Sequence, residues 1–193
     1  MTSNRHNTDS VGDILLDATR ECVLAVGVRR TTLTDVARRA GLSRMTIYRH
    51  WPDVRGLVAA LMTREWVEVA GRVRADDPVD AVVSGVRALR AHPLWRKIVE
   101  VDPELLLPYL LQRRGGSHDA MLALIEHHLA EGRARGVVRG GPPLAAMART
   151  VLLTAQSFLL SAPTMTDPPG GGGVAIEDLD AELAAVLDRY LRP

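Results

Sequence analysis

The helical period of the apolar residues limits the fold of this chain more than any other feature. In the first segment, apolar positions recur at spacings of three and four from Val11 to Val26, and Gly27 ends the pattern. This spacing places them on one face of an α-helix. We find neither an alternating apolar–polar run that would indicate a strand nor an internal repeat. The sequence therefore predicts an all-α protein.

The same pattern, interrupted by prolines and glycines, divides the rest of the chain into further helices. Two short helices are followed by a long one that Asp53 can cap. Near the C-terminus, a helix that is apolar nearly all round precedes a linker rich in proline and glycine and an amphipathic last helix. The later helices are expected at residues 35–40, 44–51, 53–75, 79–91, 94–101, 103–113, 117–135, 144–162 and 176–191, with the linker at 163–173.

Composition places the 193-residue chain among ordinary globular proteins, with 47% apolar and 24% charged residues. This length can bury a core without disulfides or metals. Cys22, the only cysteine, lies on the apolar stripe of the first segment, which predicts core packing and excludes a disulfide framework. No uncharged apolar run approaches the length of a membrane span, and the N-terminus lacks the apolar region of a secretory signal. We therefore expect a cytoplasmic protein with no membrane partner.

Basic residues are concentrated in one short stretch. Lys97 is the only lysine among 24 basic residues, so nearly all of the positive charge is arginine. Seven arginines lie between Arg29 and Arg55, where the only acidic residues are Asp35 and Asp53. From residue 76 onward, acidic residues outnumber basic ones by 15 to 12. A cationic stretch on an otherwise slightly acidic chain is typical of proteins that bind a phosphate backbone, although a solvated charged face is the alternative.

Two short helices joined by a glycine-containing turn form the most informative stretch, residues 31–51. Thr34 is expected to cap the first helix, whose Asp35 suits the positive end of the helix dipole. Gly41 can adopt the left-handed backbone needed where this helix ends, and Ser43 can cap the next one. A helix, a three-residue turn with glycine and a second helix together predict helix-turn-helix geometry.

The second helix has an outward face whose chemistry suits DNA. If Ile47 points into the core, Met45 and Arg49 lie on the opposite face, flanked by Thr46 and Tyr48. Arginine can bind guanine O6 and N7 in the major groove, and apolar groups can contact a thymine methyl group. Hydroxyl groups and the amides at helix starts can hold phosphates. These residue types therefore favour DNA binding.

A series of short motifs in fixed order and spacing covers this region. The motifs are Gly27, Thr31-Thr32-Leu33, Asp35-Val36-Ala37, Ala40-Gly41-Leu42-Ser43, Thr46-Ile47-Tyr48, His50-Trp51-Pro52-Asp53 and Leu57. With them, residues 9–69 resemble the N-terminal domain of TetR-family transcriptional regulators. The resemblance implies a three-helix DNA-binding domain over residues 9–52, after a disordered segment at 1–8. It also implies a helical domain over residues 53–193 that dimerises and binds a small-molecule effector.

The resemblance and the outward face together give a set of expected DNA contacts. Base readout is expected from Arg44, Met45, Thr46, Tyr48 and Arg49, backbone contacts from Thr32, Thr34, Ser43 and Arg55, and a further contact from His50. Two positions depart from the family. It usually has a small residue where this chain has Met45, and a phosphate-binding lysine where this chain has Val54. Arg55 is the expected substitute for that lysine.

The last two helices present more apolar surface than a small domain can bury alone, so a two-fold homodimer is expected. Its expected interface residues are Val151, Phe158, Leu179, Leu183, Val186, Leu187 and Tyr190.

An unidentified effector is expected among the helices of residues 53–162, with core packing as the alternative for each lining residue. The expected lining residues are Met62, Trp66, Trp95, Tyr109, Met121, Gln156 and Phe158.

Other motifs do not support catalysis or metal binding. His127 and His128 diverge by about 100° on a helix, which leaves His128 and Glu131 as the pair that could interact. We find no nucleophile–base pair and no cofactor fingerprint, so we expect neither enzyme activity nor a cofactor.

The sequence predicts a ligand-responsive repressor that binds a palindromic DNA operator, an inverted repeat, as a homodimer. The alternative, prompted by Val54, is a ligand-binding or protein-interaction module that has lost DNA binding.

Overall fold

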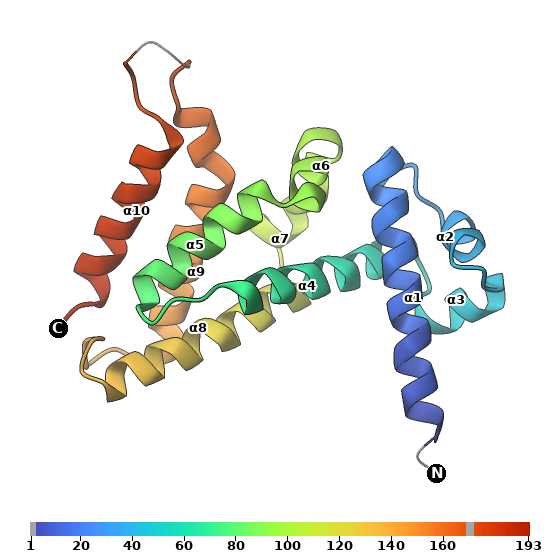
Figure 1. The fold of residues 1–193 in the computed structure, drawn as a ribbon, viewed down its shortest axis with the longest axis horizontal. Coiled ribbons are helices and arrows are strands. Elements are labelled where there is room, and N and C mark those ends of the chain that lie inside the picture. Colours follow the sequence, from blue (N-terminus) through green and yellow to red (C-terminus); the bar gives the residue numbers. More distant parts are fainter. Residues whose placement is uncertain (1–2, 169–171) are drawn as a thin grey trace. The chain divides into compact units, whose positions relative to one another are not determined.

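The computed structural model describes residues 3–168 and 172–193, and every regular element in this part of the chain is a helix (Figure 1). This confirms the all-α prediction. The elements are α1 (Ser3–Val26), α2 (Leu33–Arg39), α3 (Arg44–His50), α4 (Val54–Arg72), α5 (Pro78–Ala91), α6 (Pro93–Val101), η1 (Pro103–Leu106), α7 (Leu107–Leu111), α8 (Gly116–Ala134), α9 (Leu144–Ser161), η2 (Ala162–Met165) and α10 (Ile176–Leu191).

The helices form two compact units. The first comprises Met1–Trp66 and His92–Ser117, and the second comprises Val67–Ala91 and His118–Pro193. The first unit includes α4 as far as Trp66 together with α6, η1 and α7, which lie beyond the boundary expected at residues 52–53. That domain boundary stays a prediction. Leu94 and Ile98 of α6 are fully buried in the same core as α1, which explains why α6 belongs there.

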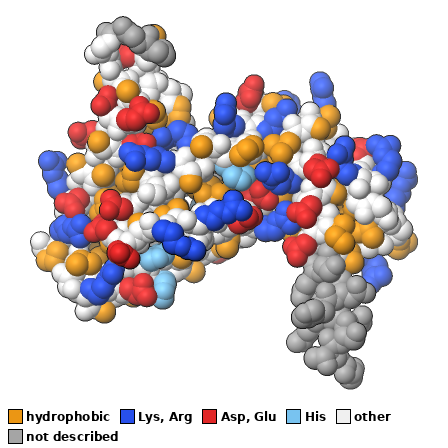
Figure 2. Space-filling model, viewed as in Figure 1, with side chains coloured by type: hydrophobic (Ala, Val, Ile, Leu, Met, Phe, Trp, Pro, Cys, Tyr) orange, Lys and Arg blue, Asp and Glu red, His pale blue; other side chains and the backbone are white. Residues whose placement is uncertain are grey.

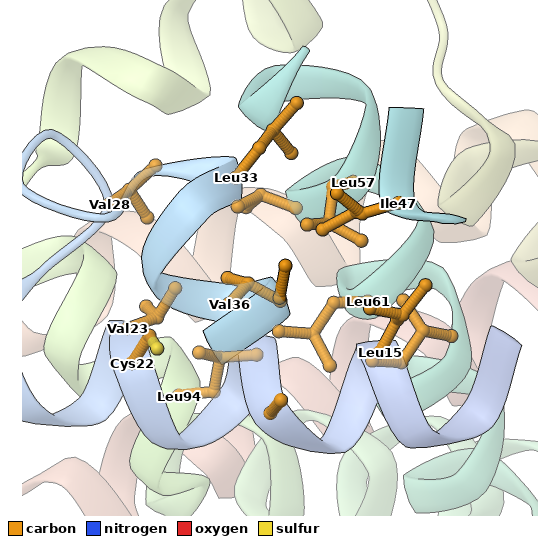
Figure 3. Close-up of a cluster of buried hydrophobic side chains, with 14 of the residues drawn as sticks. Leu15, Cys22, Val23, Val28, Leu33, Val36, Ile47, Leu57, Leu61 and Leu94 are labelled. Carbon is orange, nitrogen blue, oxygen red and sulfur yellow. The ribbon is translucent and has the colours of Figure 1, made fainter. Parts of the chain in front are cut away.

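The core of the first unit joins α1, α2, α3, the start of α4 and α6 (Figure 3). Its fully buried members include Leu15, Val36, Ile47, Leu57 and Leu61. The prediction that Cys22 packs in a core is confirmed, since its side chain is buried in this cluster. Burial raises the pKa of the Cys22 thiol and outweighs the opposing effect of the nearby Arg39, so the thiol stays protonated at neutral pH.

The second unit is built on α5, α9 and α10, which contact one another (Figure 1). Met147 and Val151 of α9 and Leu183 and Leu187 of α10 are buried in its core. The segment Leu144–Met165 is the one helix in the described part of the chain that is long and apolar enough to cross a membrane by length and composition. In this structure α9 instead packs on α5 and α10, and Arg149 interrupts its apolar sequence.

Two segments differ most from the helices expected for them. Residues 3–8, expected within a disordered segment at 1–8, belong to α1, while residues 1–2 lie outside the described part. Disorder of this segment stays a prediction. The apolar period marks where a helix packs, whereas nothing between Ser3 and Val11 breaks a helix. The helix expected at 103–113 is divided into η1 and α7, because Pro108 has no amide hydrogen with which to continue the α-helical ladder.

A buried carboxylate fixes the turn between α1 and α2. The Val28 amide donates to Asp102 Oδ2 at 2.7 Å, and Arg29 Nε donates to Asp102 Oδ1 at 3.0 Å. Gly27 has φ +84°, and a Cβ atom there would lie 2.7 Å from Asp102 Oδ2 and 3.0 Å from Val101 Cγ1. Only glycine satisfies both the backbone angle and this close approach.

We expect Gly27→Ala to destabilise the first unit by about 2 kcal/mol or more, because strain at positive φ and a clash with Asp102 add together. Gly41→Ala is the matched control. Gly41 also has positive φ, at +67°, but nothing lies within 4 Å of a Cβ there. This control should therefore cost about 1 kcal/mol from backbone strain alone. Urea unfolding of the two variants measures the difference, and equal losses would contradict the steric contact.

Candidate nucleic-acid interface

Thr32 caps the first helix of the helix-turn-helix. Its backbone is extended, and its hydroxyl oxygen accepts the Asp35 amide at 3.1 Å while donating to Asp35 Oδ2 at 2.6 Å. The prediction that Thr34 is the cap is therefore wrong, since Thr34 lies inside α2. The helix starts earlier because Leu33 is buried in the core and forms its first turn.

The turn and the start of α3 agree with the sequence prediction. Gly41 adopts the left-handed backbone, and the Leu42 amide donates to the Ala37 carbonyl at 2.9 Å. Ser43 caps α3, because its hydroxyl oxygen accepts the Thr46 amide at 3.1 Å. The Ser43 and Thr46 hydroxyls also lie 2.9 Å apart. These contacts all join residues that are close in the sequence, so the local sequence determines the turn and the start of α3.

Helix α3 has one buried face and one outward face, as predicted. Ile47 is fully buried, whereas Met45 is 72% exposed and Tyr48 is 53% exposed. Arg44 and Arg49 are exposed on either side of them. The side chains that reach solvent are therefore the arginines, the methionine and the tyrosine that can contact base edges.

Ion pairing divides the seven arginines of residues 29–55 into two groups. Three have carboxylate partners, namely Arg29 with Asp102, Arg38 with Asp35 and Arg39 with Glu21. Four form no ion pair with any residue that the structure describes, namely Arg30, Arg44, Arg49 and Arg55. Figure 2 shows Lys and Arg side chains in blue over α2 and α3. The unpaired group leaves positive charge available to an anionic partner.

Comparisons with known proteins assign the chain to a family. Residues 15–61 match the profile of the bacterial regulatory proteins of the tetR family. A Mycobacterium tuberculosis protein described as an uncharacterized HTH-type transcriptional regulator is 33% identical over 196 residues, which cover 99% of this chain and 100% of the relative. The chain belongs to the tetR family. This tetR-family protein is a DNA-binding transcriptional regulator, as its relatives are.

Other proteins share parts of the sequence or the fold. The transcriptional regulator AqdR of Rhodococcus erythropolis is 45% identical over 56 residues, which cover 28% of this chain and 27% of AqdR. The solved transcriptional repressor QsdR of R. erythropolis covers 96% of this chain and 97% of its own, with a TM-score of 0.70 and 15% identity. RolR in complex with resorcinol covers 97% and 90%, with a TM-score of 0.64 and 15% identity. Both structures have the fold of this tetR-family protein.

The expected DNA contacts all lie between Thr32 and Arg55, on α2, α3 and the start of α4. The exposed ones are Thr32, Ser43, Arg44, Met45, Tyr48, Arg49 and Arg55, and the half-buried ones are Thr34, Thr46 and His50. Two of the expected hydroxyl groups, on Ser43 and Thr46, are already bonded to each other. The contribution of each residue to DNA binding stays a prediction.

The residues expected to line an effector site divide between the two units. Met62, Trp66, Trp95 and Tyr109 belong to the first unit, and Met121, Gln156 and Phe158 belong to the second. Trp66 and Trp95 are both buried, with ring centroids 5.9 Å apart in an edge-to-face contact. Core packing thus accounts for these two tryptophans, and their role toward a ligand stays a prediction.

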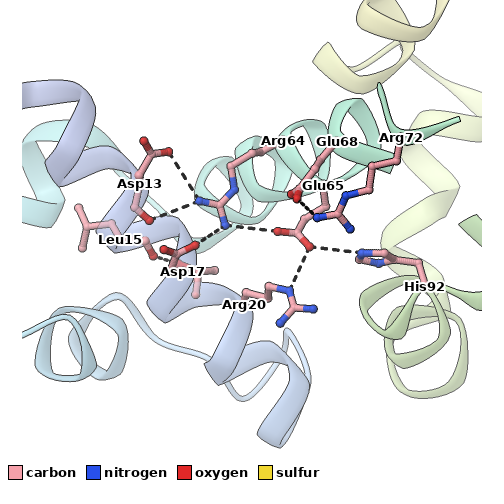
Figure 4. Close-up of polar contacts among 10 residues, drawn as sticks. Asp13, Leu15, Asp17, Arg20, Arg64, Glu65, Glu68, Arg72 and His92 are labelled. Atoms are coloured by element: carbon pink, nitrogen blue, oxygen red, sulfur yellow. Dashed lines mark hydrogen bonds and ion pairs between the residues drawn. The ribbon is translucent and has the colours of Figure 1, made fainter. Parts of the chain in front are cut away.

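A buried carboxylate that sequence reasoning missed lies next to Trp66 in the chain (Figure 4). Glu65 is 5% exposed and accepts from Arg20 Nε at 3.0 Å and from Arg64 at 3.3 Å. His92 Nε2 lies 3.4 Å from Glu65 Oε2. The carboxylate therefore ties α1 to α4 and to the residue before α6. No local pattern marks it, because Arg20 and His92 are distant in sequence.

Three of the expected dimer residues are buried within the single chain. Val151, Leu183 and Leu187 are at most 1% exposed and pack in its own core, so their role in a dimer stays a prediction. Val186 is 45% exposed, and Phe158, Leu179 and Tyr190 are half-buried. Leu153 of α9, which the sequence analysis missed, is 67% exposed. Helical periodicity shows which face is buried, but not which helix covers it.

The histidine pair of α8 also differs from expectation. His127 Nε2, rather than His128, lies 3.4 Å from Glu131 Oε1, on an exposed surface. The His128 ring instead lies 3.0 Å from the Leu124 carbonyl of its own helix. Within residues 3–168 and 172–193, no group of three or more potential metal ligands lies close enough to hold an ion.

Proposed function

We propose that this tetR-family regulator is a repressor that binds an inverted-repeat DNA operator as a homodimer. The observation that carries this proposal is the outward face of α3, where unpaired Arg44 and Arg49 flank exposed Met45 and Tyr48. Arginines not neutralised within the protein are available to guanine edges and phosphates. Repression is favoured over activation because QsdR, which shares the fold, is a transcriptional repressor.

The proposed dimer uses the exposed surfaces of α9 and α10. Leu153 and Val186 are large apolar side chains that remain exposed on these two helices. Burying such residues against a second copy removes apolar area from water, and a two-fold axis is the commonest arrangement. Two copies of α3 about 34–36 Å apart would then enter successive major grooves and match the two half-sites.

A small-molecule effector is proposed to control this binding, as RolR of the same fold has been solved with resorcinol. The effector shifts the equilibrium only if it binds the state that is incompetent for DNA more tightly than the competent one. Met62 and Tyr109 of the first unit are half-buried and are the proposed contacts to test first. Because the proposed regulator acts on genomic DNA, we propose that it is cytoplasmic. The proposed function needs no cofactor and includes no enzymatic step.

Selection of binding sites from random duplex DNA by the purified protein tests the proposal. Enrichment of an inverted repeat is expected for the unmodified protein. The variant with both Arg44→Ala and Arg49→Ala should fold normally but enrich no sequence, because both side chains are exposed. If the unmodified protein enriches nothing even at low salt, the chain is instead a module that has lost DNA binding.

Arg49→Ala is expected to weaken operator binding by about 1–3 kcal/mol and to relax specificity at one base pair, because one guanine loses its bidentate partner. Arg38→Ala is the matched control, since Arg38 is also exposed but pairs with Asp35 at 2.7 Å. The control should change specificity at no position. Binding measured against operators mutated one base pair at a time separates the cases. A uniform loss over all sequences would make Arg49 a phosphate contact.

A further inference from the structure

Met45 is an unusual residue to leave on the surface of a helix. Its side chain is 72% exposed, more than that of any other apolar residue on α3. It is the second residue of α3, directly after Arg44 and the Ser43 cap. In Figure 2, hydrophobic side chains in orange reach the surface over α3 among the blue ones. An exposed apolar side chain among exposed arginines suits a partner that carries negative charge and has an apolar group nearby.

The position of Met45 on α3 limits which part of the DNA it can meet. Residues at the N-terminal end of a recognition helix contact base edges in the major groove. Arg49 lies four residues later, so its Cβ is about 5–6 Å from that of Met45 on the same face. This separation corresponds to one or two base-pair steps. Met45 and Arg49 are therefore placed to contact neighbouring base pairs.

The major groove offers an apolar group at one kind of base. Thymine carries a C5-methyl group there, whereas the other edges present donors and acceptors. Methionine is unbranched and flexible, so its terminal atoms can adjust to a methyl group without displacing the helix. If a polar base edge lay at the same place, the methionine would displace the water bound to it without offering a hydrogen bond, which costs binding free energy.

We propose that Met45 reads one thymine C5-methyl group in each half-site, within two base pairs of the base pair that Arg49 reads. The assignment rests on the proposed function, because it requires α3 to read the operator. Met45 then determines specificity by apolar contact, while Arg49 does so by hydrogen bonds. Operator affinity depends on a single methyl group on each half-site.

Deoxyuridine substitution tests this assignment, since it removes the methyl group of thymine and leaves the base pairing unchanged. Starting from the selected operator, each thymine is replaced in turn, symmetrically in both half-sites. The unmodified protein should lose about three- to tenfold in affinity at one position near the Arg49 base pair, as expected for loss of an apolar contact. At the other thymines it should lose less than twofold.

The Met45→Ala variant, combined with the uracil substitution, completes a double-mutant cycle between the side chain and the methyl group. It should bind the thymine operator more weakly than the unmodified protein, and uracil at the assigned position should then have no further effect. Met45→Leu is the control, because it keeps an apolar side chain and should retain part of the sensitivity. Circular dichroism confirms that the variants fold.

Two results would overturn the assignment in distinguishable ways. If an operator is selected but the unmodified protein and Met45→Ala show the same uracil profile, the Met45 assignment fails while the proposed function stands. If no operator can be selected, the proposed function fails, and the Met45 assignment fails with it.

Discussion

Replacing Asp102 by alanine is expected to destabilise the first unit by about 3 kcal/mol and to weaken operator binding along with it. Asp102 is 1% exposed and accepts the Val28 amide, which is also buried, at 2.7 Å. Alanine would leave this amide without an acceptor, which costs about 1–3 kcal/mol, and would open a small cavity. Arg29 adds little to the loss, because its side chain is 68% exposed.

The position of Asp102 explains why DNA binding should follow stability. It ends α6, whereas Val28 lies in the turn before α2 of the helix-turn-helix. The Asp102–Val28 hydrogen bond therefore connects α6 directly to the chain that enters the DNA-binding helices. Its loss should increase the mobility of that turn and the entropy cost of ordering α2 and α3 on DNA.

Two variants separate this hydrogen bond from the surface charge. Asp102→Asn keeps a carbonyl oxygen that can accept the Val28 amide, so it should lose about half as much stability as alanine. Glu104→Ala is the matched control, because Glu104 pairs with the same Arg29 at 3.1 Å but is 44% exposed. Its loss should stay below about 0.5 kcal/mol. Urea unfolding gives the free energies, and a Glu104→Ala loss as large as that of Asp102→Ala would contradict the argument.

The parts of the structure that the sequence predicted well depend on neighbours close in the chain. Gly41, Ser43 and Ile47 were placed correctly because a left-handed turn, a helix cap and a helical period each involve only a few residues. The cap of α2 was misplaced by two residues, at Thr34 instead of Thr32, because both are threonines near the same helix start. The buried side chain of Leu33 decides between them, and no local rule shows that burial.

The parts that the sequence did not predict depend on contacts between distant segments. Asp102 meets Val28 across 74 positions, and nothing near either residue marks the other. The periodicity of α10 showed that Leu183 and Leu187 are buried, but could not show that their cover is this chain's own core. A second copy and α5 or α9 are equally apolar partners, so only the packed structure distinguishes them.

The second large effect is expected in the second unit, where Asp180→Ala should cost about 3 kcal/mol. Asp180 of α10 is 2% exposed, and its carboxylate accepts from Arg87 Nε at 2.9 Å and from Arg90 at 2.9 and 3.2 Å. The Arg90 side chain is only 18% exposed, so removing the carboxylate would leave a guanidinium mostly buried without its partner. Arg87 is more than half exposed and contributes less to the loss.

Asp188→Ala is the matched control on the same helix. Asp188 pairs with Arg192 at 2.7 Å, but its side chain is 51% exposed. Its loss should stay below about 1 kcal/mol, because an exposed pair is solvated and screened. Because α10 supplies part of the proposed dimer interface, sedimentation at several protein concentrations should also show weaker association for Asp180→Ala. Equal unfolding free energies for the two variants would mean that burial does not determine the strength of the Asp180 contact.

The pH dependence gives an independent test of the same contact. Burial alone would raise the pKa of Asp180, but the hydrogen bonds and charges of Arg90 and Arg87 outweigh it and hold the pKa below its ordinary value of 3.8. Since the folded pKa is the lower one, the stabilisation is present above the unfolded pKa of 3.8 and is lost as the pH falls through the folded pKa. Unfolding free energies measured from pH 7 to pH 3 should therefore fall less steeply for Asp180→Ala than for the unmodified protein below pH 4. Asp77, whose pKa is lowered by hydrogen bonds from Arg192 and the Val79 amide despite opposing burial, retains its own contribution in both proteins and cancels from the comparison.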